Sequence, residues 1–253
     1  MLALRILLVG LAAVFALRAC SGPPPDARIA VATNMVQVMD ALEAGFETQT
    51  GYEISVSSGS TGQLYAQIVH GAPYDVFMAA DQERPRLLVE NGLGVPETRW
   101  TYARGRLWLW SPNPDHFGAN GADGADSLRA GRFRHIAMAN PELAPYGVAA
   151  LDVLIALGLE GALSDRIVMG ANIGQTYSLI ASGNAEIGFI AAGQMPESGS
   201  IWVIPAHLHA PILQDAILLR RAAENPAARD FIAYLQSDPA RTILRMHGYE
   251  VDG

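Results

Sequence analysis

Ser57-Ser58-Gly59-Ser60-Thr61-Gly62 is a run of hydroxyl side chains and glycines between a strand-like segment at 52–56 and a helix-like segment at 63–69. Ser60 and Gln63 have the spacing of a capping box, in which the serine accepts from an early helix N–H and the glutamine reaches back. A helix N-terminus carries unpaired N–H groups and a partial positive charge. The stretch therefore predicts either a capped surface helix or an anion site.

The same order of strand, polar loop and helix recurs along the chain. Thr33-Asn34 follows a strand at 28–32, and Asn34 has the capping-box spacing with Gln37. Tyr146 begins a helix after a strand at 135–139, and the loop 170–174 joins a strand at 166–169 to a helix at 175–181. Tyr146 is either a hydroxyl donor or an aromatic wedge. The recurrence favours an anion site over a lone cap.

Strands alternate with helices through most of the sequence, which indicates an α/β fold with parallel strands. Half of the 253 residues are apolar, enough to bury a large core in one or two domains. Two helices near the C-terminus, at 227–236 and 239–247, are predicted to cover a sheet. The other expected strands lie at 75–80, 106–110, 186–191, 201–204 and 216–219.

The N-terminal segment has the pattern of an export signal. Arg5 precedes an apolar run at 6–17, which predicts a signal peptide at 1–19. Cys20 is the only cysteine and resembles a lipoprotein processing site, although Arg18 departs from the usual small or apolar residue. Two outcomes stay open: a lipid anchor at Cys20, or cleavage nearby that leaves a soluble periplasmic protein. Residues 20–27 are predicted to form a flexible tether.

Composition and motifs argue against several functions. A formal net charge of −8 without a basic run argues against nucleic acid as a partner. The sequence has no Walker-type P-loop and no GxSxG elbow, and its histidines lack metal-ligand spacing. We therefore predict no cofactor and no enzymatic activity, and an exported hydrolase is the weakest alternative because no nucleophile with a base partner can be named.

The sequence resembles the periplasmic molybdate-binding proteins of ABC transporters across nearly the whole mature chain. The most specific match is GAPYDVFMAAD at 71–81. The other matching segments are 29–34, 60–62, 66–68, 140–142 and 188–189. The resemblance implies a type II periplasmic binding protein, with two α/β lobes that close a cleft around the ligand. The first lobe would comprise 28–103 and 207–253, and the second lobe 104–206.

The same resemblance implies a ligand site, which contacts the oxygens of the oxyanion. Thr33, Asn34, Ser60 and Thr61 would bind from the first lobe, and Tyr146 with the backbone N–H of Ile173 from the second. Many members of the family have a tyrosine donor at the position of Ala191. This chain lacks that donor, and the resemblance implies that Tyr146 compensates for it. Tetrahedral dianions present only acceptors, so hydroxyls, amides and helix N-termini satisfy them without a cationic residue.

The resemblance also implies partners and a location. The protein would be a periplasmic monomer that binds molybdate, and tungstate with it, and delivers the ligand to an inner-membrane ABC permease. A receptor for another tetrahedral oxyanion or a small solute on the same fold is the alternative.

Overall fold

The computed structural model describes residues 24–118 and 124–251. The predicted signal peptide, Cys20 and the first part of the predicted tether lie outside the described residues. The last part of that tether belongs to the fold, because the Asp26 N–H donates to the Glu53 carbonyl (2.8 Å) and Ala27 pairs with Ile54. The first strand thus begins at Ala27 rather than Arg28.

The first sheet has five strands in the order β2-β1-β3-β10-β4. Strand β1 pairs in parallel with β2 and β3, whereas β10 is antiparallel to β3 and β4. The strands are β1 (Ala27–Ala32), β2 (Ile54–Gly59), β3 (Val76–Met78), β4 (Trp100–Gly105) and β10 (Ile212–Leu218). The helices beside it are α2 (Val36–Thr50), α3 (Thr61–Val69), α4 (Glu83–Glu90), α9 (Pro226–Leu235) and α10 (Asp238–Met246).

Alternating side chains bury both faces of this sheet. Ile29 and Val31 of β1 pack into a core with α2, α9 and α10, while Ala30 between them packs with Leu64 of α3 and Leu88 of α4. Helix α10 packs mainly on α2, and α9 contacts β10 and β1 directly.

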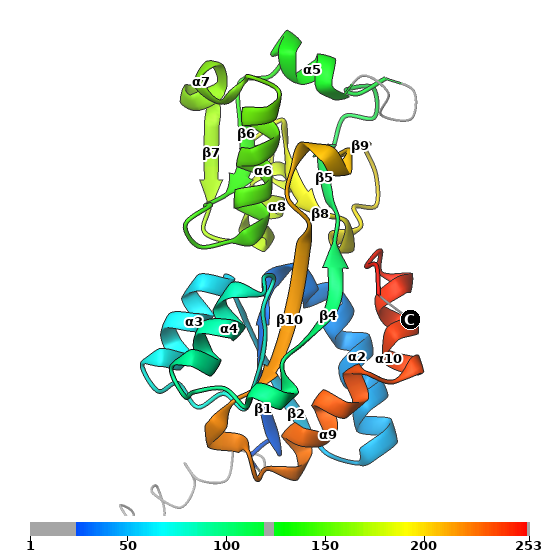
Figure 1. Cartoon of the computed structure of the whole chain (residues 1–253). Helices are drawn as coiled ribbons and strands as arrows, with labels where there is room; N and C mark the ends of the chain where they lie inside the picture. The colour runs from blue at the N-terminus through cyan, green and yellow to red at the C-terminus, as the bar shows by residue number, and fades with distance from the viewer. Residues whose placement is uncertain (1–23, 119–123, 252–253) are drawn as a thin grey trace, which may run out of the picture.

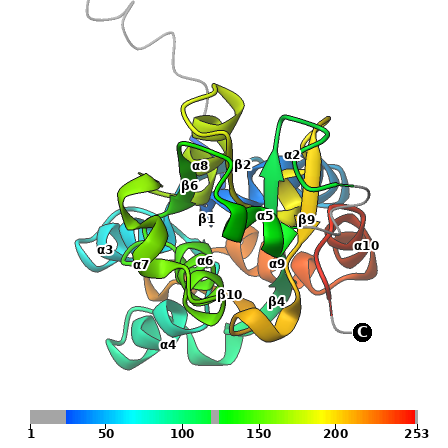
Figure 2. The ribbon, with the colours of Figure 1, turned by 90° about the horizontal axis from the view of Figure 1, so that it is seen from above.

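The second sheet also has five strands, in the order β7-β6-β8-β5-β9. The main apolar core of this lobe lies on the face of the sheet that α6 covers. A smaller apolar cluster around Trp110 and Ile180 lies on the face that α8 covers. Figure 2 shows these two helices on opposite sides of β6. The elements are β5 (Leu107–Ser111), α5 (Gly124–Ala130), β6 (Ile136–Ala139), α6 (Pro145–Ala156), α7 (Glu160–Leu163), β7 (Ile167–Gly170), α8 (Ile173–Ala181), β8 (Ile187–Ala191) and β9 (Ser200–Val203).

Each sheet with its helices forms a lobe, and Figure 1 shows the two lobes one above the other, with the antiparallel strands β4 and β10 running along the connection between them. The chain passes from the first sheet to the second at Arg106, and it returns between Val203 and Ile212. These crossings lie beside the lobe boundaries predicted at 104 and 207. The short 3-10 turns are η1 (Thr33–Met35), η2 (Pro96–Thr98), η4 (Ser164–Arg166), η5 (Ala192–Gln194), η6 (Ala206–Leu208) and η7 (Arg220–Ala222).

The two-lobed α/β fold is confirmed, with corrections to individual strands. The sheets are mixed rather than parallel, because β10 and β5 run antiparallel to their neighbours. Strand β2 continues through the predicted loop to Gly59, since Ser57 and Ser58 pair with β1. Strand β4 was not predicted, and β10 begins at Ile212 rather than Ala216 because it also pairs with β4.

Among the described residues, no single helix is both long and apolar enough to cross a membrane. The helices Pro145–Ala156 and Glu160–Arg166, which meet at a bend, are together long and apolar enough by length and composition alone.

Candidate functional site

A small cavity lies between the two lobes, and every predicted ligand residue lines it. Thr33, Asn34, Ser60 and Thr61 reach it from the first lobe, and Tyr146 and Ile173 from the second. The predicted residues were spread over more than a hundred positions of sequence, and the fold brings them to one place. The remaining lining residues are Ala32, Gly59, Ala80, Ala144, Pro145 and Asn172.

The residues meet because strands of both sheets end at this cavity. Strand β1 ends at Ala32 and β2 at Gly59, and their continuations η1 and α3 begin at its wall. In the second lobe, the first residues of α6 and α8 reach the same space. Helix N-termini of α3, α6 and α8 thus converge on the cavity, and each contributes a partial positive charge. This arrangement favours an anion.

The two lobes are closed on each other around the cavity. The Gly62 N–H at the start of α3 donates to the Leu143 carbonyl in the second lobe (2.9 Å). From the second lobe, the Gly174 N–H donates to the Thr33 hydroxyl (3.3 Å). These bonds tie the two walls together at their rims.

The hydroxyl groups at the cavity already accept hydrogen bonds from the protein. Ser60 Oγ accepts from Gln63 N (3.3 Å), and Thr61 Oγ1 accepts from Ala80 N (3.1 Å). Tyr146 OH accepts from Gln214 Nε2 (3.2 Å), as the Thr33 hydroxyl does from Gly174. A hydroxyl that accepts from a fixed donor keeps its own O–H for another acceptor. Each of these groups therefore has a proton to offer to a ligand.

Two backbone N–H groups are also available, at the first helical positions of α3 and α8. In α3, the Gly62 N–H donates to the Leu143 carbonyl and the Gln63 N–H donates to Ser60 Oγ. The Thr61 N–H has no protein acceptor among the described residues. In α8, the Gly174 N–H donates to the Thr33 hydroxyl and the Gln175 N–H donates to Asn172 Oδ1. The Ile173 N–H likewise has no protein acceptor among the described residues. The first N–H groups of a helix have no intrahelical partner. The availability of the Ile173 N–H agrees with its predicted role.

Asn34 differs from its prediction. It lies inside η1 and does not cap α2, whose N-cap residue Met35 makes no side-chain capping bond. Its Nδ2 instead donates to Gln214 Oε1 (2.9 Å) and to Tyr249 OH (3.2 Å), so both amide protons are used within the protein. Its buried Oδ1 has no partner among the described residues. The capping box at Asn34 and Gln37 is thus wrong, whereas Ser60 does cap α3 as predicted.

Burial keeps the tyrosines at the site protonated. The pKa values of Tyr146 and Tyr102 are raised well above the usual value, mainly because burial disfavours the phenolate. The pKa of Tyr249 is raised for the same reason, although its bond with Asn34 opposes the shift. Their hydroxyls therefore remain neutral hydrogen-bond donors over the physiological pH range.

No carboxylate and no cationic side chain belongs to the residues that line the cavity. Asp75 faces away, where it accepts from Arg28 N (2.7 Å) and pairs with Arg221 (2.6 Å). Asp81 lines a neighbouring groove between the lobes and pairs with Arg84 (2.7 Å). Burial raises the pKa of Asp81, and Arg84 opposes that shift. Within the described chain, His, Cys, Asp and Glu side chains form no cluster suited to a metal ion.

Residues that support the site were missed by the sequence reasoning. Gln214 and Tyr249 contact Asn34, and Gln194 links the Ala191 N–H (2.9 Å) to the Ile173 carbonyl (3.0 Å). One signal was present: Gln214 and Asp215 interrupt an apolar run at 212–219 that is otherwise typical of a buried strand. Tyr249 carries no comparable signal, because it reaches the site from the C-terminal segment.

Comparison with known proteins agrees with this geometry. Residues 27–250 match the family described as bacterial extracellular solute-binding protein. The molybdate-binding protein ModA of Azotobacter vinelandii is 40% identical over 238 residues, which cover 92% of this chain and 93% of that protein. The ModA of Rhodobacter capsulatus is 40% identical over 222 residues, 87% of this chain and 86% of that one.

A solved structure of the Azotobacter vinelandii periplasmic molybdate-binding protein superimposes with a TM-score of 0.85. It is 38% identical, and the match covers 90% of this chain and 100% of that one. The chain therefore belongs to the family of bacterial extracellular solute-binding proteins and, within it, to the group of relatives that are named molybdate-binding proteins.

Proposed function

We propose that this protein is a periplasmic receptor that captures molybdate, and tungstate with it, between its lobes and hands the ligand to an inner-membrane ABC permease. The names of its relatives support molybdate as the ligand. The proposed ligand contacts are the hydroxyls of Thr33, Ser60, Thr61 and Tyr146 and the backbone N–H groups of Thr61 and Ile173, with Asn34 beside them in the cavity wall. No catalytic step is assigned to the site.

One observation carries the proposal: hydroxyls of both lobes line one small cavity, and each already accepts a hydrogen bond from an N–H group of the protein. A molybdate dianion presents only oxygen acceptors, so such a wall matches it without a counter-charge from lysine or arginine. The helix N-termini of α3, α6 and α8 add partial positive charge at the same place. Exclusion of water by closure strengthens each bond.

Opening of the lobes is the proposed route for entry and release. The bonds that close the cavity, from Gly62 to Leu143 and from Gly174 to Thr33, are few and lie at its rim. The lobes, proposed as 28–103 with 207–253 and as 104–206, are joined where the chain crosses between the sheets. A rotation about these crossings would expose the ligand.

We also propose export across the inner membrane, since the described fold follows a segment with a signal-peptide pattern. Cys20 would then either carry a lipid anchor or be left near the free N-terminus of a periplasmic monomer.

Addition of molybdate is expected to stabilise the mature protein as a 1:1 complex. At a ligand concentration 100 times Kd, the free energy of unfolding rises by about 2.7 kcal/mol, or roughly 5 to 10 °C in Tm for a protein of this size. Calorimetric titration gives the stoichiometry, and a thermal melt gives the shift. Folded protein that shows no heat and no shift with either molybdate or tungstate would refute the proposed function.

Thr61→Ala is expected to weaken molybdate binding by about 10- to 100-fold, since a hydrogen bond to a charged group is worth roughly 1.5–3 kcal/mol. The Thr61 hydroxyl is buried and accepts only from Ala80 N, so its proton is free for the ligand. Calorimetry measures the affinity, and circular dichroism checks the fold. Thr48→Ala, an exposed threonine on α2, is the matched control. Equal affinities of the two variants would remove Thr61 from the site.

A further inference from the structure

Gln214 is a fully buried residue of β10 that connects the two lobes through its side-chain amide. Its Nε2 donates to Tyr146 OH in the second lobe (3.2 Å). Its Oε1 accepts from Asn34 Nδ2 (2.9 Å) and from Tyr102 OH (2.9 Å) in the first lobe. It does not line the cavity itself, yet it touches both Asn34 and Tyr146, which do.

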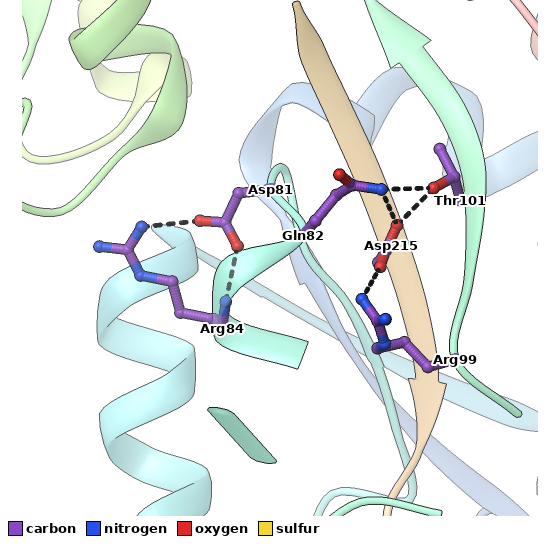
Figure 3. Close-up of polar contacts among 6 residues, drawn as sticks. All are labelled: Asp81, Gln82, Arg84, Arg99, Thr101 and Asp215. Carbon is purple, nitrogen blue, oxygen red and sulfur yellow. Dashed lines mark hydrogen bonds and ion pairs between the residues drawn. The ribbon is translucent and has the colours of Figure 1, made fainter. Parts of the chain in front are cut away.

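The backbone at Gln214 is held in place from the opposite side of the strand. The pairing of β10 with β4 shifts register between Gln214 and Asp215, which gives a local bulge. Figure 3 shows the Asp215 carboxylate bound by Arg99 (2.8 Å), Thr101 (2.7 Å) and Gln82 (3.3 Å). Because Asp215 is buried and accepts three hydrogen bonds, this anchor fixes the position from which the Gln214 side chain reaches toward the site.

The hydrogen-bond directions around Gln214 are determined by a backbone carbonyl. Tyr249 OH lies 2.6 Å from the Asn34 carbonyl oxygen, which can only accept, so the single Tyr249 proton is donated there. Tyr249 must then accept from Asn34 Nδ2 (3.2 Å), and this fixes which way the Asn34 amide faces. The other Asn34 proton goes to Gln214 Oε1, which leaves Gln214 Nε2 toward Tyr146.

We propose that Gln214 is a positioning residue that makes Tyr146 a hydrogen-bond donor to the bound oxyanion, with Tyr249 and Asn34 fixing its direction. The inference rests on the proposed function, since it concerns the same ligand. If the Gln214 amide were reversed, its Oε1 would face Tyr146 OH and take the proton that the ligand needs. The relay from Tyr249 through Asn34 prevents that reversal.

Gln214→Glu tests the direction of this relay. An ionised glutamate offers no proton to Tyr146 and places a negative charge near the ligand. A protonated glutamate has one O–H donor and a carbonyl oxygen, which can replace the one N–H and the oxygen that the Gln214 amide uses here. We expect molybdate affinity at about pH 8 to fall at least 100-fold, and the loss to shrink by 10-fold or more at about pH 6. Wild-type affinity should change less than about 3-fold over this range, because burial raises the pKa values of the ionisable groups that face position 214, namely Tyr102, Tyr146 and Tyr249.

Calorimetric titration at both pH values separates the possible results. Gln37→Glu, the same change at an exposed glutamine of α2, is the control and should behave as wild type. A Gln214→Glu affinity loss that is equal at both pH values, or no loss, would overturn the inference while leaving the proposed function intact. Failure of the wild type to bind molybdate would instead refute the proposed function.

A double-mutant cycle tests the same inference without a new charge, and it decides the matter if Gln214→Glu does not fold. Tyr249→Phe removes the group that fixes the Asn34 amide, and Tyr146→Phe removes the donor that the relay serves. We expect Tyr249→Phe to weaken binding about 3- to 10-fold in the wild type and to have little further effect in Tyr146→Phe. Fully additive losses would show that Tyr249 does not act through Tyr146, and the inference would be wrong.

Discussion

Gly105→Ala is expected to weaken molybdate binding by about 100-fold. Gly105 is buried at the end of β4, where a β-carbon would lie less than 3.0 Å from the Tyr146 hydroxyl and 2.6 Å from Gln214 Nε2. Both neighbours are buried and hydrogen-bonded, so they have little room to move. The methyl group would push Tyr146 off the ligand and hold the lobes apart at the hinge. Loss of a hydrogen bond to a charged ligand, worth roughly 1.5–3 kcal/mol, lowers the affinity by up to about 100-fold. Incomplete closure of the lobes lowers it further.

Calorimetric titration with molybdate checks this result, with Gly161→Ala as the matched control. Gly161 lies in α7, and a β-carbon there meets no atom within 4 Å. The control should bind as wild type and be slightly more stable, because alanine favours helix over glycine. Melts without ligand separate a binding defect from a folding defect. Wild-type affinity in Gly105→Ala would mean that Tyr146 and Gln214 are not part of the closed ligand site.

Much of the fold follows from local sequence patterns. Short apolar strands such as β6 and β7 and their following helices could be predicted, because each is bounded by polar or glycine-rich turns. Strand β4 and the first half of β10 could not, since they are long-range partners of each other at the crossing between lobes. Their pairing depends on segments that are more than a hundred residues apart in sequence, and no local pattern records it. The antiparallel direction of β10 was missed for the same reason.

The candidate site divides in the same way. Residues at strand-to-helix junctions, such as Ser60, Thr61 and Ile173, could be located because the junction itself is a sequence pattern. The orientation of a side chain could not, because it depends on distant partners. Asn34 looked like a helix cap, yet its amide is bound by Gln214 and Tyr249, which lie far along the chain. Asn34 lines the cavity, and its predicted capping role was wrong.

Phosphate is expected to bind at least about 100-fold more weakly than molybdate near neutral pH. The hydrogen phosphate dianion carries one proton, which needs an acceptor, whereas the hydroxyls of Ser60, Thr61 and Tyr146 all present protons. The protonated phosphate oxygen loses one hydrogen bond to a charged group, which costs roughly 1.5–3 kcal/mol of binding free energy. Two protein donors that face this oxygen are left unpaired, at a cost of roughly 1–3 kcal/mol each. Hydroxyl groups can rotate and accept weakly, so rejection is strong without being absolute.

Competition calorimetry with phosphate against molybdate measures this ratio, and sulfate serves as the reference anion. Sulfate is a tetrahedral dianion without such a proton, so it should be rejected only because its smaller size leaves donors at the wrong distance. Phosphate that competes at concentrations comparable to molybdate would require a carboxylate at the ligand. Asp81 is the candidate, since it lines the adjoining groove between the lobes. In that event Asp81→Asn should abolish the competition, and the assignment of a wall without a carboxylate would be wrong.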